Sequence, residues 1–139
     1  MRVMGLCFRA DKLLLVQQQV PQQSRFWLPP GGGVQFGERQ EEALRREFRE
    51  ETGLEVSVLE FARVSEFIQP PFHAIELIYR VAIVGGKLTL GKDPEHPEDK
   101  QLIRQVAFLS HDEIKRIPSA QRHSLLQDPA WMWEKAREA

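Results

Sequence analysis

Three glutamates on one predicted helix are the residues of this chain best suited to chemistry. Glu47, Glu50 and Glu51 stand at i, i+3 and i+4, so their carboxylates share one helix face. They also lie in the last turns, where the helix dipole is negative and like charges repel. A bound divalent cation would reverse both unfavourable effects. Magnesium suits such a site because it prefers carboxylate oxygens and is usually shared with substrate phosphates. The spacing therefore predicts a magnesium site, which manganese could also fill.

The same segment has a more ordinary interpretation. Arg45, Arg46 and Arg49 alternate with these glutamates, and most Glu/Arg helices simply carry a solvated charged face. The preceding loop favours the metal site over the solvated face, because Gly31-Gly32-Gly33 lets the backbone approach a ligand closely. A glycine triplet alone is more often a turn than a phosphate-binding loop. The hypothesis therefore depends on the loop and the helix together.

The loop and the helix combine into one longer pattern. It reads Gly32-x5-Glu38-x7-Arg46-Glu47-Phe48-x-Glu50-Glu51-x-Gly53-Leu54. This pattern resembles the signature of the Nudix hydrolases, the MutT-like enzymes, and every specified position is filled. A match with so many fixed residues and spacings is highly specific. Two flanking positions depart from the usual lead-in: Pro29 stands where family members commonly carry Leu, and Gln35 stands where an acid is common.

The resemblance implies roles for the residues of this box, which spans residues 32–54. Glu50 and Glu51 would be the principal magnesium ligands. Glu47 would be a further ligand or the base that takes a proton from the attacking water. The main-chain carbonyl of Gly31 or Gly32 would supply a backbone ligand. Such a metal lowers the pKa of bound water and neutralises phosphate charge, as cleavage of a diphosphate at neutral pH requires.

Two further implications concern residues around the glutamates. Arg46 would hold the glutamates in place through ion pairs. Family members often supply another acid just before the strand that leads to the last helix, but the segment around Gln105 has no carboxylate. The nearest substitutes are Glu95, Glu98 and Asp99 in the preceding loop.

Aromatic side chains outside the box could form a pocket for a nucleobase, and residues 67–72 could form a lid over it. For each aromatic residue, packing in the core or in a hairpin is the more common role. The four histidines show no metal-ligand spacing, and we assign them no role. The candidate substrate contacts are Trp27, Phe67, Phe72, Tyr79, Glu95 and Glu98.

The elements that must position these residues follow from local patterns. Apolar runs predict strands at residues 3–8, 13–16, 56–60, 62–67, 75–84 and 102–109. High helix propensity predicts a helix over 38–52 that ends at Gly53. Signals for a capping box and for a helix start predict two later helices, at Ser110-x-x-Glu113 and at Asp128-Pro129. Residues 17–24 and 27–37 are predicted as loops.

This order of elements is similar to that of the Nudix fold. The resemblance implies an α/β/α sandwich with a mixed sheet, of the α+β class. A length of 139 residues suits one domain, so we expect a single Nudix domain over residues 1–139.

Composition limits the partners of the chain. A net charge of -1 gives no general attraction for nucleic acid or for an anionic membrane, so a small nucleotide-like substrate is expected rather than a long polynucleotide. Cys7 is the only cysteine, which excludes an intramolecular disulfide and favours a reducing compartment. With no recognisable leader or membrane span, the cytoplasm is expected. The sequence is also compatible with a homodimer.

We therefore expect a magnesium-dependent hydrolase that cleaves a diphosphate linkage through attack of water on phosphorus. Its substrate would be a nucleoside diphosphate linked to another moiety, or a nucleoside triphosphate. The main alternative is a Nudix-like domain that binds a nucleotide as a sensor without cleaving it, although such domains typically lose the box glutamates. Isopentenyl diphosphate isomerisation on the same fold has less support, given the lone Cys7 and the short chain.

Overall fold

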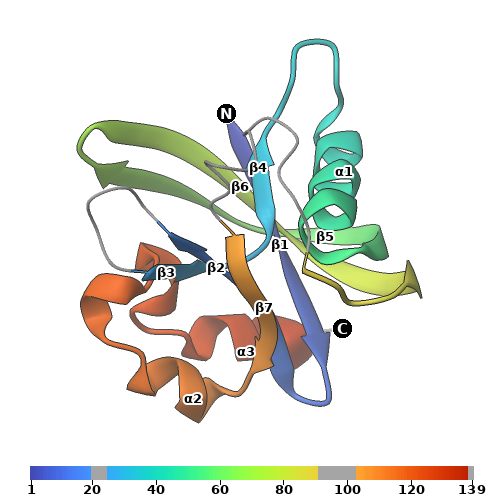
Figure 1. Ribbon diagram of the computed structural model, residues 1–139. Coiled ribbons are helices and arrows are strands. Elements are labelled where there is room, and N and C mark those ends of the chain that lie inside the picture. The colour runs from blue at the N-terminus through green and yellow to red at the C-terminus, as the bar shows by residue number, and fades with distance from the viewer. Residues whose placement is uncertain (20–24, 91–102, 138–139) are drawn as a thin grey trace.

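A mixed β-sheet lies at the centre of the fold (Figure 1). The computed structural model describes residues 1–19, 25–90 and 103–137. The strands are β1 (Arg2–Arg9), β2 (Lys12–Gln19), β3 (Arg25–Leu28), β4 (Gly31–Gly33), β5 (Leu54–Gln69), β6 (Phe72–Gly86) and β7 (Ile103–Leu109). The helices are α1 (Gln40–Thr52), α2 (His111–Arg116) and α3 (Ala130–Arg137), with short 3-10 turns η2 (Ser119–Gln121) and η3 (Ser124–Leu126) before α3.

Strand β1 organises the sheet. The strand order is β3-β2-β1-β6-β5, with β4 paired to β1 and β7 paired to β2. β1 runs parallel to β6 and antiparallel to β2 and β4. Val3 is opposite Gly32 on one side and Leu77 on the other, so the first half of β1 lies between β4 and β6. The glycine segment is thereby fixed next to a buried strand.

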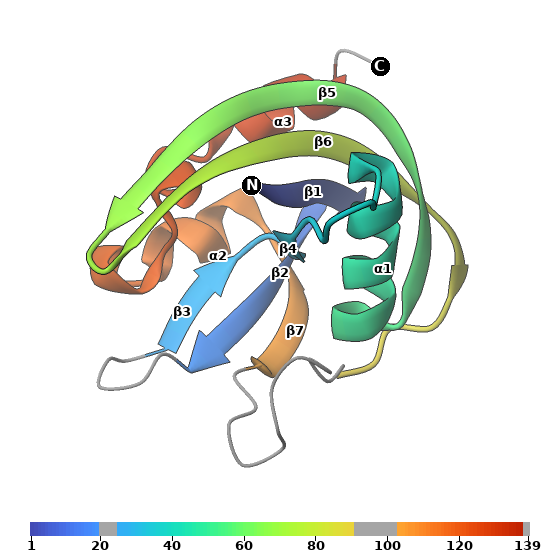
Figure 2. The ribbon, with the colours of Figure 1, turned by 90° about the horizontal axis from the view of Figure 1, so that it is seen from above.

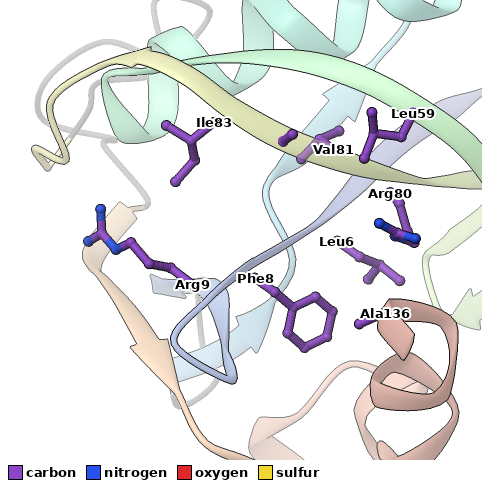
Figure 3. A pocket seen from close by; sticks show the side chains of 9 residues that line it. Leu6, Phe8, Arg9, Leu59, Arg80, Val81, Ile83 and Ala136 are labelled. Atoms are coloured by element: carbon purple, nitrogen blue, oxygen red, sulfur yellow. The ribbon is translucent and has the colours of Figure 1, made fainter. Parts of the chain in front are cut away.

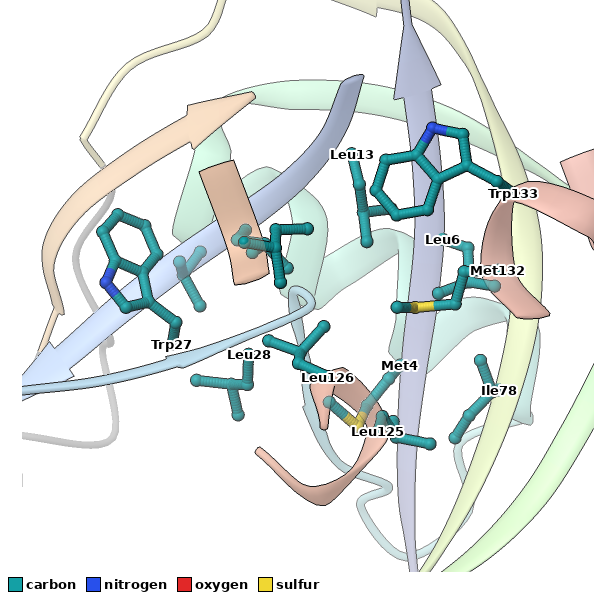
Figure 4. Packing of buried hydrophobic residues seen from close by; sticks show 13 residues of the cluster. Met4, Leu6, Leu13, Trp27, Leu28, Ile78, Leu125, Leu126, Met132 and Trp133 are labelled. Atoms are coloured by element: carbon teal, nitrogen blue, oxygen red, sulfur yellow. The ribbon is translucent and has the colours of Figure 1, made fainter. Parts of the chain in front are cut away.

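Helices cover both faces of the sheet, so the predicted α/β/α sandwich is confirmed (Figure 2). On one face, α1 packs through Ala43, Leu44 and Phe48. On the other face, side chains of η3 and α3 pack against β1 and β6. Figure 4 shows side chains from both sides of this contact. The helical segment contributes Leu125, Leu126, Met132 and Trp133, and the sheet contributes Met4, Leu6 and Ile78.

The predicted helices are present, with small shifts in their ends. α1 begins at Gln40, two residues after the predicted start at residue 38. It ends as predicted at Gly53, whose φ of 76° is the left-handed conformation that favours glycine. The capping box is confirmed, because the Ser110 hydroxyl accepts from the Glu113 N–H while the Glu113 carboxylate accepts from the Ser110 N–H. The last helix follows Asp128-Pro129 as expected.

The loop predictions for residues 17–24 and 27–37 were partly wrong, because both segments contain strand residues. Two segments that were predicted as separate strands form a single strand. Residues 17–19 continue β2, and the segment 27–37 contains the end of β3 and all of β4. Glycines have low strand propensity, but Gly31 comes so close to β1 that an added Cβ would lie 2.1 Å from the Val3 carbonyl oxygen. Tertiary packing therefore overrides propensity there. Residues 56–60 and 62–67 belong to the single strand β5, whose register shifts near Phe61 where the prediction placed a break.

Two further observations concern the expectations drawn from composition. Cys7 is fully buried in the core under α1, and burial raises the pKa of its thiol to about 11. Within residues 1–19, 25–90 and 103–137, no helix is long and apolar enough to cross a membrane.

Candidate active site

The box glutamates project from α1 beside the glycine strand β4. Leu44 and Phe48 are fully buried and fix the rotation of the helix about its axis. This rotation also buries two charged side chains, since Glu47 is only 6% exposed and Glu51 only 4%. A carboxylate at this depth is costly unless cations or hydrogen-bond donors surround it. The two buried glutamates therefore depend on specific partners.

Arg46 is the cation that joins the glutamates of the box. Its Nη1 atom lies 3.0 Å from Glu47 Oε1 and 3.2 Å from Glu50 Oε2. Its Nε and Nη2 atoms donate to the two carboxylate oxygens of Glu38, at 2.7 and 3.1 Å. Nη2 also donates to the Gly33 carbonyl oxygen at 3.0 Å. One guanidinium thus ties three carboxylates of the box to the glycine strand.

These contacts shift the pKa of Arg46 and the pKa of Glu38, which it binds through two hydrogen bonds. The hydrogen bond from Arg46 is the largest cause that lowers the pKa of Glu38, and burial opposes it. The same contact is the largest cause that raises the pKa of Arg46 above its usual range. Both groups are therefore charged at neutral pH, as an internal counterion arrangement requires.

The glycine strand fits closely against the other two glutamates. The Gly31 N–H donates to Glu51 Oε1 at 2.9 Å in a buried hydrogen bond. A Cβ added at Gly32 would lie 2.5 Å from the carboxyl carbon and Oε1 of Glu47. A side chain at position 32 would therefore displace the Glu47 carboxylate. The role of the Gly31 or Gly32 carbonyl as a metal ligand stays a prediction, and the structure places these two glycines against the carboxylates of Glu51 and Glu47.

The donor set can be compared with the needs of a divalent cation. Glu47 and Glu50 each place one carboxylate oxygen within 3.2 Å of the same atom, Arg46 Nη1, so these two oxygens lie on the same side of the helix. Oxygen ligands of this kind suit magnesium. Glu51, by contrast, is directed to the Gly31 N–H, and in the described parts of the chain no three acidic, histidine or cysteine side chains form a complete metal-binding group. The oxygen chemistry of Glu47, Glu50 and Glu51 fits magnesium.

The aromatic candidates lie in different surroundings. Trp27 is buried in the core on the α3 side of the sheet. Tyr79 packs edge-on against Phe61, and its hydroxyl donates to Gln40 of α1. Phe72 is 60% exposed at the tip of the β5–β6 hairpin. Glu95, Glu98 and Asp99 lie outside the described residues.

Phe67 lines a pocket. The pocket has a volume of about 500 Å³ and lies between β3, the end of β5 and the segment 119–127. Phe26 and Phe67 form its aromatic part, with ring centroids 6.3 Å apart. Its polar lining residues are Glu66, Gln69, Ser119, Arg122, Ser124 and Gln127.

A second pocket, of about 360 Å³, lies between β1, β6 and the end of α3 (Figure 3). Its walls are mainly apolar, formed by side chains such as Leu6, Phe8 and Leu59. Arg9 and Arg80 are its only charged lining residues. Because it contains no carboxylate and no residue of the box, it is not part of the candidate active site.

Sequence reasoning missed one buried polar pair, Glu76 and His123. Each residue is 1% exposed, and His123 Nε2 lies 2.9 Å from Glu76 Oε1. No motif identifies His123. A signal for Glu76 did exist, because it alternates with Ile78 in β6 and therefore faces the same core. A charged residue in such an inward position predicts a buried partner.

The Glu38–Arg46 contact predicts a specific pH dependence of stability. A carboxyl whose pKa is lowered by folding stabilises the protein above its ordinary pKa of 4.5, and this contribution is lost as the pH falls through the folded-state pKa. Glu38→Gln should therefore lower the free energy of unfolding at pH 7 by a few tenths to about 1 kcal/mol. The difference from wild type should shrink below pH 4.5. Urea denaturation at both pH values measures it, with Glu41→Gln as a control. A deficit that is unchanged at low pH would contradict the assigned ionisation.

Known proteins show similarity over almost the whole chain. The NUDIX domain family model matches residues 1–127. An ADP-ribose pyrophosphatase of Methanocaldococcus jannaschii is 33% identical over 114 residues, which cover 79% of this chain and 67% of that protein. The chain therefore spans about two thirds of that relative.

Solved structures support the same fold. The MutT protein of Methanosarcina mazei Go1 superposes with a TM-score of 0.71 at 20% identity, over 99% of this chain and 92% of that one. A UDP-X diphosphatase superposes with a TM-score of 0.70 at 20% identity, over 99% of this chain but only 63% of that one. At this identity the superpositions concern the fold alone. Together with the family match and the filled signature, they show that the chain belongs to the Nudix hydrolase family.

Proposed function

We propose that this chain is a magnesium-dependent hydrolase that cleaves the diphosphate linkage of a nucleoside diphosphate joined to another moiety, or of a nucleoside triphosphate. The observation that carries the proposal is the convergence of Glu47 and Glu50 on one cationic atom, Arg46 Nη1. A helix that merely carried a solvated charged face would not bury Glu47 and Glu51 to 6% and 4% exposure.

Each residue of the box has a distinct part in this function. Glu47, Glu50 and Glu51 would hold magnesium, which supplies an acidified water and neutralises charge on the phosphate oxygens. Arg46 is a positioning residue, because it fixes the carboxylates of Glu47 and Glu50 and reaches the Gly33 carbonyl. The Gly31 N–H orients Glu51 through its hydrogen bond.

Removal of the proton from the attacking water requires a base. Glu47 is the candidate within the box. Gln105 in β7 occupies the neighbourhood where relatives often carry an acid, and its amide donates to Gln17 Oε1 at 3.0 Å. A neutral amide cannot act as the base there. The acids of the preceding loop, Glu95, Glu98 and Asp99, stay predictions for this role.

The pocket lined by Phe26 and Phe67 suits the nucleoside part of such a substrate. Two aromatic rings offer faces for a planar base, and Gln69 and Ser119 offer hydrogen-bonding groups at the pocket wall. Known relatives are named for ADP-ribose and UDP-X, both of which join a nucleoside diphosphate to a second moiety. These names support the substrate class without selecting one compound.

The metal requirement and the box glutamates can be tested in one experiment. ADP-ribose, nucleotide sugars, dinucleotides and modified dNTPs are screened with magnesium and then with excess EDTA. Activity should require the metal. Glu50→Gln and Glu51→Gln should each lower kcat by about a hundredfold or more, because each removes charge that holds the cation in the transition state.

The matched control is Glu41→Gln, which lies on the same helix outside the signature and is exposed beside Arg45. It should leave kcat within about twofold, as expected for a surface ion pair. Equal losses in all three variants, or full activity in EDTA, would refute the proposal. Nucleotide binding without turnover of any compound would favour a sensor domain.

Two adjacent glycines provide a sharper test of the geometry. A Cβ at Gly32 would strike the end of the Glu47 side chain, whereas a Cβ at Gly33 would meet nothing within 4 Å. Gly32→Ala should therefore move the Glu47 carboxylate and lower kcat by about tenfold or more, while the fold persists. Gly33→Ala should retain wild-type kcat. Steady-state kinetics and thermal melts of both variants check this expectation, and equal kinetics would contradict the placement of Glu47.

A further inference from the structure

The buried pair Glu76–His123 joins the segment 119–127 to the sheet. Glu76 lies on β6, and His123 immediately precedes η3. His123 Nε2 is 2.9 Å from Glu76 Oε1 and 3.2 Å from Oε2. The carboxylate also accepts from the Ser65 hydroxyl at 3.2 Å, and Arg2 Nε lies 3.8 Å away. A carboxylate buried this deeply needs these partners, so the imidazole cannot be lost without consequence.

The hydrogen bonds of His123 determine which ring nitrogen carries the proton. The Leu125 N–H donates to Nδ1 at 3.0 Å, so Nδ1 is an acceptor and Nε2 is the donor to Glu76. The backbone N–H of His123 donates to the Trp27 carbonyl oxygen at 2.9 Å. One residue therefore holds together β3, β6 and η3.

The His123 ring lies directly behind the aromatic pocket. It stacks on Phe67 with ring centroids 4.6 Å apart and an interplanar angle of 18°. Its centroid is 6.2 Å from that of Phe26. Both phenylalanines line the pocket, whereas His123 does not. The imidazole thus supports the two rings from the buried side.

The pair also lies close to the glycine strand β4 in the register of the sheet. Glu76 is opposite Ser65 on one side and Arg2 on the other, and Arg2 is in turn opposite Gly33 of β4. Neighbouring strands are about 4.8 Å apart, so Glu76 lies about 10 Å from Gly33 along this row. Glu76, which holds His123 behind the pocket, and Gly33, whose carbonyl contacts Arg46, therefore lie in the same row of the sheet.

We infer that His123 and Glu76 are positioning residues for substrate recognition. His123 is held in one ring orientation by Glu76 and Leu125, and it holds Phe67 and Phe26 in the wall of the pocket, with their ring centroids 6.3 Å apart. This inference rests on the proposed function, because it assigns the pocket to the nucleoside part of the substrate. It adds residues outside the box that set the affinity for the base and leave the chemical step unchanged.

One variant of each residue tests the pair. His123→Asn retains an acceptor for the Leu125 N–H but loses the donor to Glu76 and the ring. Glu76→Leu removes the acceptor for His123 Nε2 and should raise KM and Kd in the same direction as His123→Asn, because the ring loses its fixed orientation. For His123→Asn, we expect KM for the turned-over substrate and Kd for AMP and GMP, measured by calorimetry, to rise about threefold to tenfold. That range corresponds to the net contribution of one hydrogen bond. We expect kcat to change less than twofold.

The matched control is His111→Gln. His111 also lies near a carboxylate and an aromatic ring, with Nδ1 4.0 Å from Asp112 Oδ1 and its ring centroid 5.3 Å from that of Trp133, but it does not line the aromatic pocket and should not affect binding. Unchanged KM and mononucleotide Kd in His123→Asn, whatever its Tm, would overturn the inference and leave the pair a stabiliser of the fold. If His123→Asn does not fold, His123→Gln, which retains a donor for Glu76, is judged by the same criteria. The binding measurements need no turnover, so failure of the proposed hydrolysis would remain distinguishable from failure of this inference.

Discussion

The arrangement of the site depends on the contacts that hold four acidic side chains near a short strand of glycines. Arg46 compensates Glu38, Glu47 and Glu50, while the Gly31 N–H compensates Glu51. Because buried carboxylates are costly without partners, this set of contacts restricts where α1 can lie relative to β4. Glycine at position 32 is required for the same reason, since any Cβ there would overlap Glu47.

The rest of the fold maintains this constraint from both sides. β1 lies between β4 and β6 and fixes the glycine strand by register. Phe48 and Leu44 fix the rotation of α1, so that the glutamates face β4. On the other face of the sheet, Glu76 and His123 hold the segment 119–127 against β3 and β6. The glutamates of the box and the aromatic pocket are thus supported by neighbouring residues of the same sheet.

The sequence predicted much of the fold and the box, because these depend on local spacing. The helix of the box and its end at Gly53 follow from propensity and from the need for a left-handed residue. β4 could not be predicted in the same way, because its glycines form a strand only through close contact with β1. The Glu76–His123 pair joins residues 47 positions apart, so no local pattern contains it. The direction of Glu51 toward the Gly31 N–H likewise depends on tertiary packing, which spacing along a helix does not specify.

The most direct test of this account is the effect of magnesium on thermal stability. Wild type, Glu50→Gln and Glu41→Gln are melted in EDTA and in millimolar magnesium at one ionic strength. Binding to the folded state should stabilise wild type and Glu41→Gln by about 2.7 kcal/mol at a hundredfold excess of magnesium over Kd. Glu50→Gln should lose most of this gain, because it lacks one of the two carboxylates that converge on Arg46 Nη1. A wild-type Tm that does not respond to magnesium, or an equal shift in all three proteins, would contradict the assignment of the box as a metal site.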